Sequence, residues 1–246
     1  MAFVLLTISV SANADDWITN YYEHPTPERF VAEVQAMSRS GYLANAKSSQ
    51  PIAAFLGRVM GANPSQIEGW LNKLDGLNGE DKNTLLLAAS LSQRIEARNY
   101  IRRQAGGDKY LETTDIRTVE PKDAFILDML WGDFSATGEE MPIRRIVYAL
   151  NYEKYSGALK RFETSKKTQQ DREEAILEST FEAARWSLES NIQQHHRVAE
   201  IIEKIYWDGK VSHSEQLWLS VILAHGLPEK YELTQIRSGE WAFKRK

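Results

Sequence analysis

The sequence predicts an all-α fold, a multi-helix array of short antiparallel helices followed by a long-helix bundle. Three observations lead to this prediction. Sustained alternation of apolar and polar residues, the pattern of a half-buried strand, is almost absent. Helix N-caps and glycine or proline stops recur along the chain. A heptad-spaced apolar pattern occupies much of the second half, as in helical bundles.

Cap and stop signals divide the first half into short helices. Thr26, Ser49 and Asn63 stand where N-caps are expected, each with a proline within the next two residues. The third of these opens a capping-box pattern. A longer helix is predicted over residues 80–104. The polar segment 108–120 is predicted to be a linker or loop.

The second half contains the heptad pattern. Its apolar positions are Leu177, Phe181, Ala184, Leu188, Val198, Ile202 and Ile205. Asn191 and His195 fill two intervening seam positions, so one continuous helix is predicted over residues 168–206. A capping box at 212–215 predicts the last helix, and the tail from 238 to 246 is expected to be frayed.

The N-terminus has the features of a secretory signal peptide. The apolar run from Ala2 to Val10 precedes Ser11-Ala12-Asn13-Ala14, which predicts cleavage after Ala14. No lysine or arginine precedes the run, and a start codon assigned too far downstream would explain this. The alternative is a buried first strand or helix. We expect residues 1–14 to be removed and the mature protein to be periplasmic or secreted, with no membrane span.

Composition excludes several classes of function. The 246 residues include 30 Lys+Arg and 34 Asp+Glu, a net charge of −4 without the basic excess of nucleic-acid binders. The chain has no cysteine, which excludes disulfides, thiolate catalysis and zinc–thiolate sites. No phosphate loop, dinucleotide fingerprint or other cofactor motif is present, so we expect no cofactor. Residues 15–151 are expected to form an N-terminal helical region and residues 152–246 a long-helix region, as one domain or two.

The segment 128–138 contains aromatic residues, is punctuated by glycines and leads into residues 142–145. It covers the end of a helix predicted over residues 122–134 and a turn at Gly138, before a helix predicted over residues 142–150. One interpretation is the lip of a binding pocket. The candidate binding residues are Trp131, Asp133, Arg144 and Arg145. The alternative is a helix end packed under a tight turn. No set of residues in the sequence predicts catalysis.

Two adjacent histidines suggest a metal site. His195 falls on the helical seam and His196 on its flank, so their side chains diverge. A di-iron bundle would need Glu-x-x-His pairs on two helices, and the sequence contains none. We therefore expect a partly buried His195 beside a solvated acidic stripe, and no metal.

The segment Asp208-Gly209-Lys210-Val211-Ser212-His213-Ser214-Glu215 partly matches a calcium-binding EF-hand loop. The first and third ligand positions of that loop would be Lys204 and Tyr206, which supply no carboxylate, so no calcium site is expected. Glu215 is explained as the capping-box partner of Ser212. The segment resembles the Asp-Gly-x-hydrophobic-Ser-x-x-Glu turn of TerB-like helical domains, which implies a helical fold and no activity.

A second resemblance covers the first half of the chain. Its residues are Pro25-Thr26-Pro27-Glu28, Pro51-Ile52-Ala53-Ala54-Phe55-Leu56, Asn63-Pro64 and the segment 131–138. Together they resemble exported bacterial all-helical proteins of unassigned function. The sequence favours a non-enzymatic accessory module that binds an unknown protein partner in the periplasm. The alternative is a hydrolase-like enzyme with a site built from scattered acidic and histidine residues.

Overall fold

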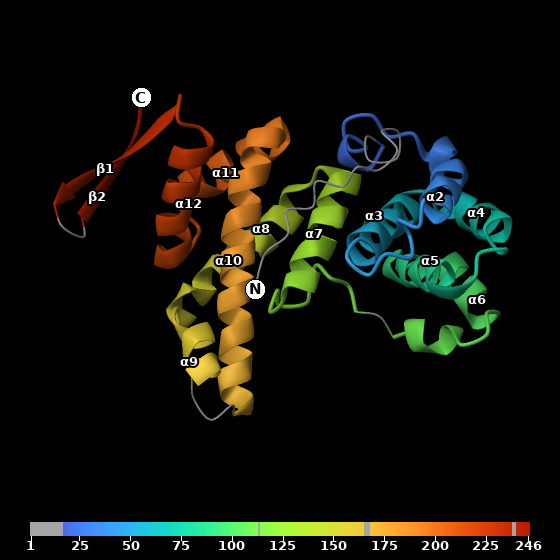
Figure 1. Ribbon diagram of the computed structural model, residues 1–246. Helices are drawn as coiled ribbons and strands as arrows, with labels where there is room; N and C mark the ends of the chain where they lie inside the picture. The colour runs from blue at the N-terminus through green and yellow to red at the C-terminus, as the bar shows by residue number, and fades with distance from the viewer. Residues whose placement is uncertain (1–16, 113, 165–167, 238–239) are drawn as a thin grey trace. The chain divides into compact units, whose positions relative to one another are not determined.

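The computed structural model describes residues 17–112, 114–164, 168–237 and 240–246 (Figure 1). The predicted signal peptide, residues 1–14, lies outside the described residues. The chain divides into two compact units. Unit 1 comprises residues up to 118 together with 131–138, and unit 2 comprises residues 119–130 and 139–246. No helix in the described ranges is both long and apolar enough to cross a membrane.

The predicted all-α fold class is confirmed, with one small sheet added. The helices of unit 1 are η1 (Pro27–Arg29), α2 (Phe30–Arg39), α3 (Ser49–Ala62), η2 (Pro64–Gln66), α4 (Ile67–Lys73), α5 (Gly79–Leu91), α6 (Ile95–Arg102) and η3 (Gly107–Tyr110). Helix α7 (Ala124–Thr137) contributes its first half to unit 2 and its second half to unit 1. Unit 2 continues with α8 (Glu140–Tyr148), η4 (Ala149–Tyr155), α9 (Ala158–Thr164), α10 (Gln169–Gln194), α11 (His196–Asp208), α12 (His213–Gly226), β1 (Tyr231–Arg237) and β2 (Glu240–Arg245).

The core of unit 1 is centred on the packing of α3 against α5. Two glycines of α3 allow the helices to approach closely. A Cβ atom on Gly57 would lie 2.8 Å from the carbonyl oxygen of Ala88, and one on Gly61 would lie 3.1 Å from that of Ser92. Around this contact, Phe55, the neighbouring aliphatic side chains of α3 and three leucines of α5 (Leu85, Leu86 and Leu91) are buried.

The helix predicted over residues 80–104 is interrupted, so this prediction was wrong. Helix α5 ends at Leu91 and α6 begins at Ile95. Gln93 between them has a φ of 56°, the left-handed conformation that ends helices. The hydroxyl of Ser92 donates to the carbonyl of Ala89 and accepts from the backbone N–H of Arg94. These local side-chain bonds compete with the helical ladder and explain the break.

None of the three predicted N-caps in unit 1 forms. Ser49 is the first residue inside α3, and Ser48 before it makes no capping hydrogen bond. The other two residues have different partners. Thr26 makes no capping hydrogen bond, and its hydroxyl instead accepts from the indole N–H of Trp17 at 3.0 Å. The side-chain amide of Asn63 donates backward to the carbonyl of Val59 at 2.8 Å instead of capping the next helix. In both cases a residue on the preceding chain provides the better partner.

The continuous helix predicted over residues 168–206 is likewise broken, into α10 and α11. His195 separates them with an extended backbone, φ −124° and ψ 110°. The amide of Asn191 donates to the carbonyl of Ser187, one turn earlier, and leaves a polar patch at the helix end. The apolar positions Leu188 and Val198, on either side of the break, are fully buried. The periodicity therefore identified buried faces correctly, although it did not reveal the break.

The C-terminal tail, expected to be frayed, instead forms an antiparallel hairpin of β1 and β2 (Figure 1). Tyr231 pairs with Arg245 and Leu233 with Phe243. The rings of Tyr231 and Phe243 stack at 5.2 Å between centroids, and Phe243 also contacts Tyr206 of α11. This aromatic cluster buries Tyr231 and anchors the hairpin to the helices.

Candidate functional site

The four candidate binding residues do not share a unit. Trp131 and Asp133 lie on the part of α7 that belongs to unit 1, whereas Arg144 and Arg145 lie on α8 in unit 2. Each is engaged in contacts within its own unit.

Asp133 is fully buried and its carboxylate is closed off by two arginines. Arg117 donates to both carboxylate oxygens at 2.6 Å, and the Nε of Arg58 lies 3.0 Å from Oδ2. Arg58 also donates to Asp115 at 2.7 Å. Burial alone would raise the pKa of Asp115, but bonds from the Arg117 backbone and the Arg58 side chain lower it below its usual range. These ion pairs hold the segment that contains Asp115 and Arg117 against α3 and α7. They also leave Asp133 inaccessible to a ligand.

Trp131 is part of a tightly packed helix surface. A Cβ atom on the next residue, Gly132, would lie 2.1 Å from the carbonyl oxygen of Pro51, so α7 touches α3 backbone to backbone. The Trp131 ring packs edge-on against Phe134 at 6.0 Å. Its indole N–H is buried with no hydrogen-bond acceptor among the described residues. Residues 128–137 thus lie within α7 and not in an open loop.

The two arginines of α8 form internal contacts. Arg144 pairs with Glu140 on its own helix and with Asp208 at 3.4 Å. Hydrogen bonds from Lys204, at 2.7 Å, and from Arg144 lower the pKa of Glu140. Arg145 donates to the carbonyl of Val119. Both arginines thereby join α8 to other segments of unit 2.

Neither of the other two motifs gathers a metal-ligand set. His195 is half-buried, and His196 is 83% exposed, 3.4 Å from Glu200. Within the described residues, no group of three or more histidines and carboxylates is placed to hold a metal ion.

The capping box at Ser212 and Glu215 is confirmed, with both hydrogen bonds present. The second carboxylate oxygen of Glu215 accepts from the amide of Asn151 at 2.9 Å. Both oxygens of this carboxylate are thus engaged in joining α12 to η4.

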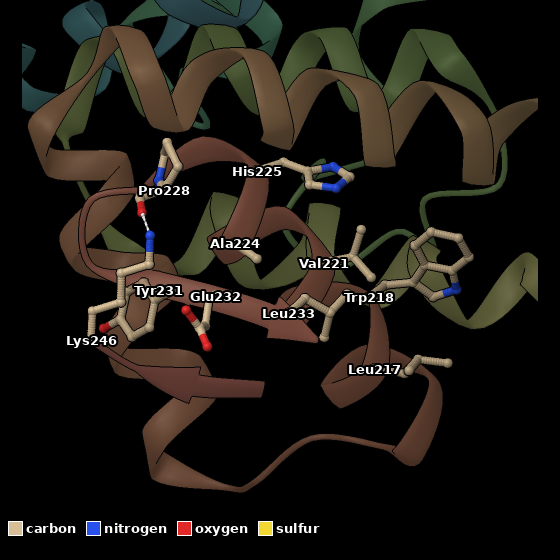
Figure 2. Close-up of a pocket in the computed structure, with 10 residues that line it drawn as sticks. All are labelled: Leu217, Trp218, Val221, Ala224, His225, Pro228, Tyr231, Glu232, Leu233 and Lys246. Carbon is tan, nitrogen blue, oxygen red and sulfur yellow. Dashed lines mark hydrogen bonds between the residues drawn. The ribbon is translucent and has the colours of Figure 1, made fainter. Parts of the chain in front are cut away.

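The structure instead places an apolar groove in unit 2, between α12 and β1 (Figure 2). Its volume is about 570 Å³, within the range of ligand-binding clefts. The lining residues of α12 and the turn after it are Leu217, Trp218, Val221, Ala224, His225 and Pro228. The hairpin contributes Tyr231, Glu232, Leu233 and Lys246. Figure 2 shows the side chains of Val221 and Leu233 directed into the same hollow.

The charged residues of the groove have partners within the chain. Glu232 pairs with its cross-strand neighbour Lys244 at 2.7 Å. The ring of His225 lies 2.6 Å from Glu189. The ammonium of Lys246 donates to the carbonyl of Pro228 at 2.7 Å. The groove therefore offers mainly hydrophobic contact and no convergent set of catalytic groups.

Sequence reasoning missed this groove for two reasons. The capping box predicts where the last helix begins, but not that Leu217 on it is 41% exposed. No strand was predicted over residues 231–237, and the residues that pair with this strand lie in the tail that was expected to be frayed. The available signals were the spacing of Leu217, Val221 and Ala224, which marks a second apolar face of α12, and the alternation of Tyr231 and Leu233 with polar residues.

Comparisons with protein-family models, curated proteins and solved structures gave no match. The resemblances to exported helical proteins and to the TerB-like turn stay predictions.

Proposed function

We propose that this chain is an exported, non-enzymatic accessory protein that binds a partner protein through the groove between α12 and β1. The observation that carries the proposal is the groove itself, a largely apolar surface of unit 2 that no described residue covers. Apolar clefts with partnered charges at the rim are typical of sites that bind other proteins.

The distribution of exposed apolar side chains supports unit 2 as the binding unit. Among the described residues, seven of the eight large hydrophobic side chains that are most exposed belong to it. They are Phe125, Tyr148, Leu159, Ile176, Trp186, Trp207 and Leu217. Tryptophans such as Trp186 and Trp207, 53% and 57% exposed, are the residue type most enriched at binding hot spots. The eighth, Ile95, lies in unit 1 and provides a matched control.

Site-specific photocrosslinking tests the proposal. A benzoylphenylalanine at position 217, in the groove, should give one discrete adduct in cells that express the protein naturally. The same group at position 95 is at least as accessible to solvent, because Ile95 is 59% exposed and Leu217 is 41% exposed, and it should give none. The adduct should also disappear when Val221 is replaced by lysine. No adduct from position 217, or equal adducts from both positions, would contradict the proposal.

Export is tested separately. The apolar run from Ala2 to Val10 and the small residues up to Ala14 support cleavage after Ala14. N-terminal sequencing of the periplasmic protein should therefore begin at Asp15. Recovery of the uncleaved chain from the cytoplasm would refute export without bearing on the groove.

A further inference from the structure

Within the described residues the sheet has two strands, so one edge of β1 has no strand beside it. The backbone N–H of Lys246 donates to the carbonyl of Lys230 at 2.8 Å, so these residues stand at the position of a hydrogen-bonded pair in the ladder. Such pairs alternate along an antiparallel ladder. Every second residue of β1, including Leu233 and Gln235, therefore directs its main-chain N–H and C=O away from β2. The N–H of Tyr231 on this edge is already bound to the carbonyl of Leu227 at 3.0 Å.

The open edge borders the groove. Of the two strands, β1 is the one packed on α12, while Phe243 of β2 contacts α11. The exposed face of α12 extends past β1 from Pro228 back to Leu217 (Figure 2). A strand added beside β1 would lie over this face, and alternate side chains would enter the apolar groove.

The dimensions of the groove suit a short segment. The edge from Tyr231 to Gln235 is about 17 Å long at about 3.3 Å per residue. The groove is lined by ten residues, whereas each partner in a stable protein dimer contributes about 20–30 residues to the interface, so the groove is too small to hold a dimer together. The charges of Glu232, His225 and Lys246 are satisfied internally, so the side chains that enter should be uncharged.

We infer that the groove binds an extended segment of the partner protein, about five residues long, as a third strand on the open edge of β1. The segment carries uncharged apolar side chains at alternate positions. Main-chain bonds to Leu233 and Gln235 provide the alignment, and contacts with Val221 and its neighbours on α12 provide selectivity. This inference rests on the proposed function and specifies how the partner is recognised.

Selection from a random twelve-residue peptide library displayed on phage, with the full chain as bait, tests the inference. Enriched peptides should share apolar residues at positions i, i+2 and i+4. Gln235→Pro removes an outward-facing N–H and should lower the affinity of a synthetic selected peptide at least tenfold. The matched Gln235→Ala variant should change it less than twofold. N-methylation of alternate backbone nitrogens in the peptide removes hydrogen-bond donors from the other side of the same ladder. It should lower the affinity as Gln235→Pro does, without any change to the protein.

Four outcomes would overturn the inference. Peptides with helical i, i+3, i+4 spacing, or peptides indifferent to both Gln235→Pro and N-methylation, would refute strand addition and leave groove binding intact. A dimer in light scattering that Gln235→Pro converts to a monomer would mean that a second copy occupies the edge. Failure to enrich any peptide would reject the inference. If position 217 also gave no crosslink, the proposed function would be rejected too.

Discussion

Replacing Asp133 by asparagine should destabilise the protein strongly, because this carboxylate is structural and not part of a binding site. The side chain is fully buried and takes three charge-assisted contacts, at 2.6, 2.6 and 3.0 Å, from Arg117 and Arg58. Asparagine keeps the shape but removes the charge and points an N–H₂ group at a guanidinium. Both arginine side chains are only 17% exposed, so water cannot replace the lost partner.

The expected cost follows from that geometry. Removing one partner of a buried ion pair costs about 3–5 kcal/mol. For a chain of this length, this corresponds to a fall in Tm of roughly 6–20 °C. Urea denaturation followed by tryptophan fluorescence would measure the free energy of unfolding.

The matched control is Asp208→Asn, which makes the same chemical change at an exposed ion pair. The Asp208 side chain is 40% exposed and lies 3.4 Å from Arg144. It should cost less than about 1 kcal/mol. If Asp133→Asn also costs less than about 1 kcal/mol, or if the two variants are indistinguishable, the structural role of the Asp133 cluster is refuted.

Three further variants test packing, capping and charge, and the first of them has a matched control. Gly132→Ala should cost about 2–3 kcal/mol in chemical denaturation, because its methyl group meets the Pro51 carbonyl. Gly69→Ala, on an open face of α4, should gain about 0.5–1 kcal/mol, and equal effects would argue against the contact. Ser212→Ala should lose about 1 kcal/mol, and no change in Tm would deny the cap. Glu140→Gln should cost about 1 kcal/mol at pH 7. Since hydrogen bonds from its basic neighbours lower the pKa of Glu140, this difference should fade as the pH falls below about 4, and a pH-independent difference would contradict it.

Local patterns predicted the helices better than they predicted the breaks between them. The capping box at 212–215 depends on two residues three positions apart, so sequence alone identifies it. The break at His195 depends on where each apolar face finds its partner, which is tertiary information. The hairpin was missed because Tyr231 and Leu233 form too short an alternation to stand out without the aromatic side chains of α11 beneath it.

The candidate site was less predictable than the fold. Asp133 in an aromatic, glycine-containing segment resembles a ligand-binding group until its partners are known. Those partners, Arg58 and Arg117, come from distant positions in an otherwise unremarkable sequence. The groove likewise exists because none of the described residues covers Leu217. The periodicity of a sequence shows which faces are apolar, but not which of them the fold leaves exposed.

The path of the chain through α7 constrains how this protein is made and dissected. Unit 1 is completed only by residues 131–138, after residues 119–130 of unit 2 have already been synthesised. Division of the chain at any single position therefore cannot give two fragments that each contain one complete unit. Whenever the chain folds, residues 17–118 cannot complete their core until the second half of α7, with the buried Phe134, has packed on them. Before that step, the backbone of α3 at Pro51 lacks the neighbour that it meets at Gly132.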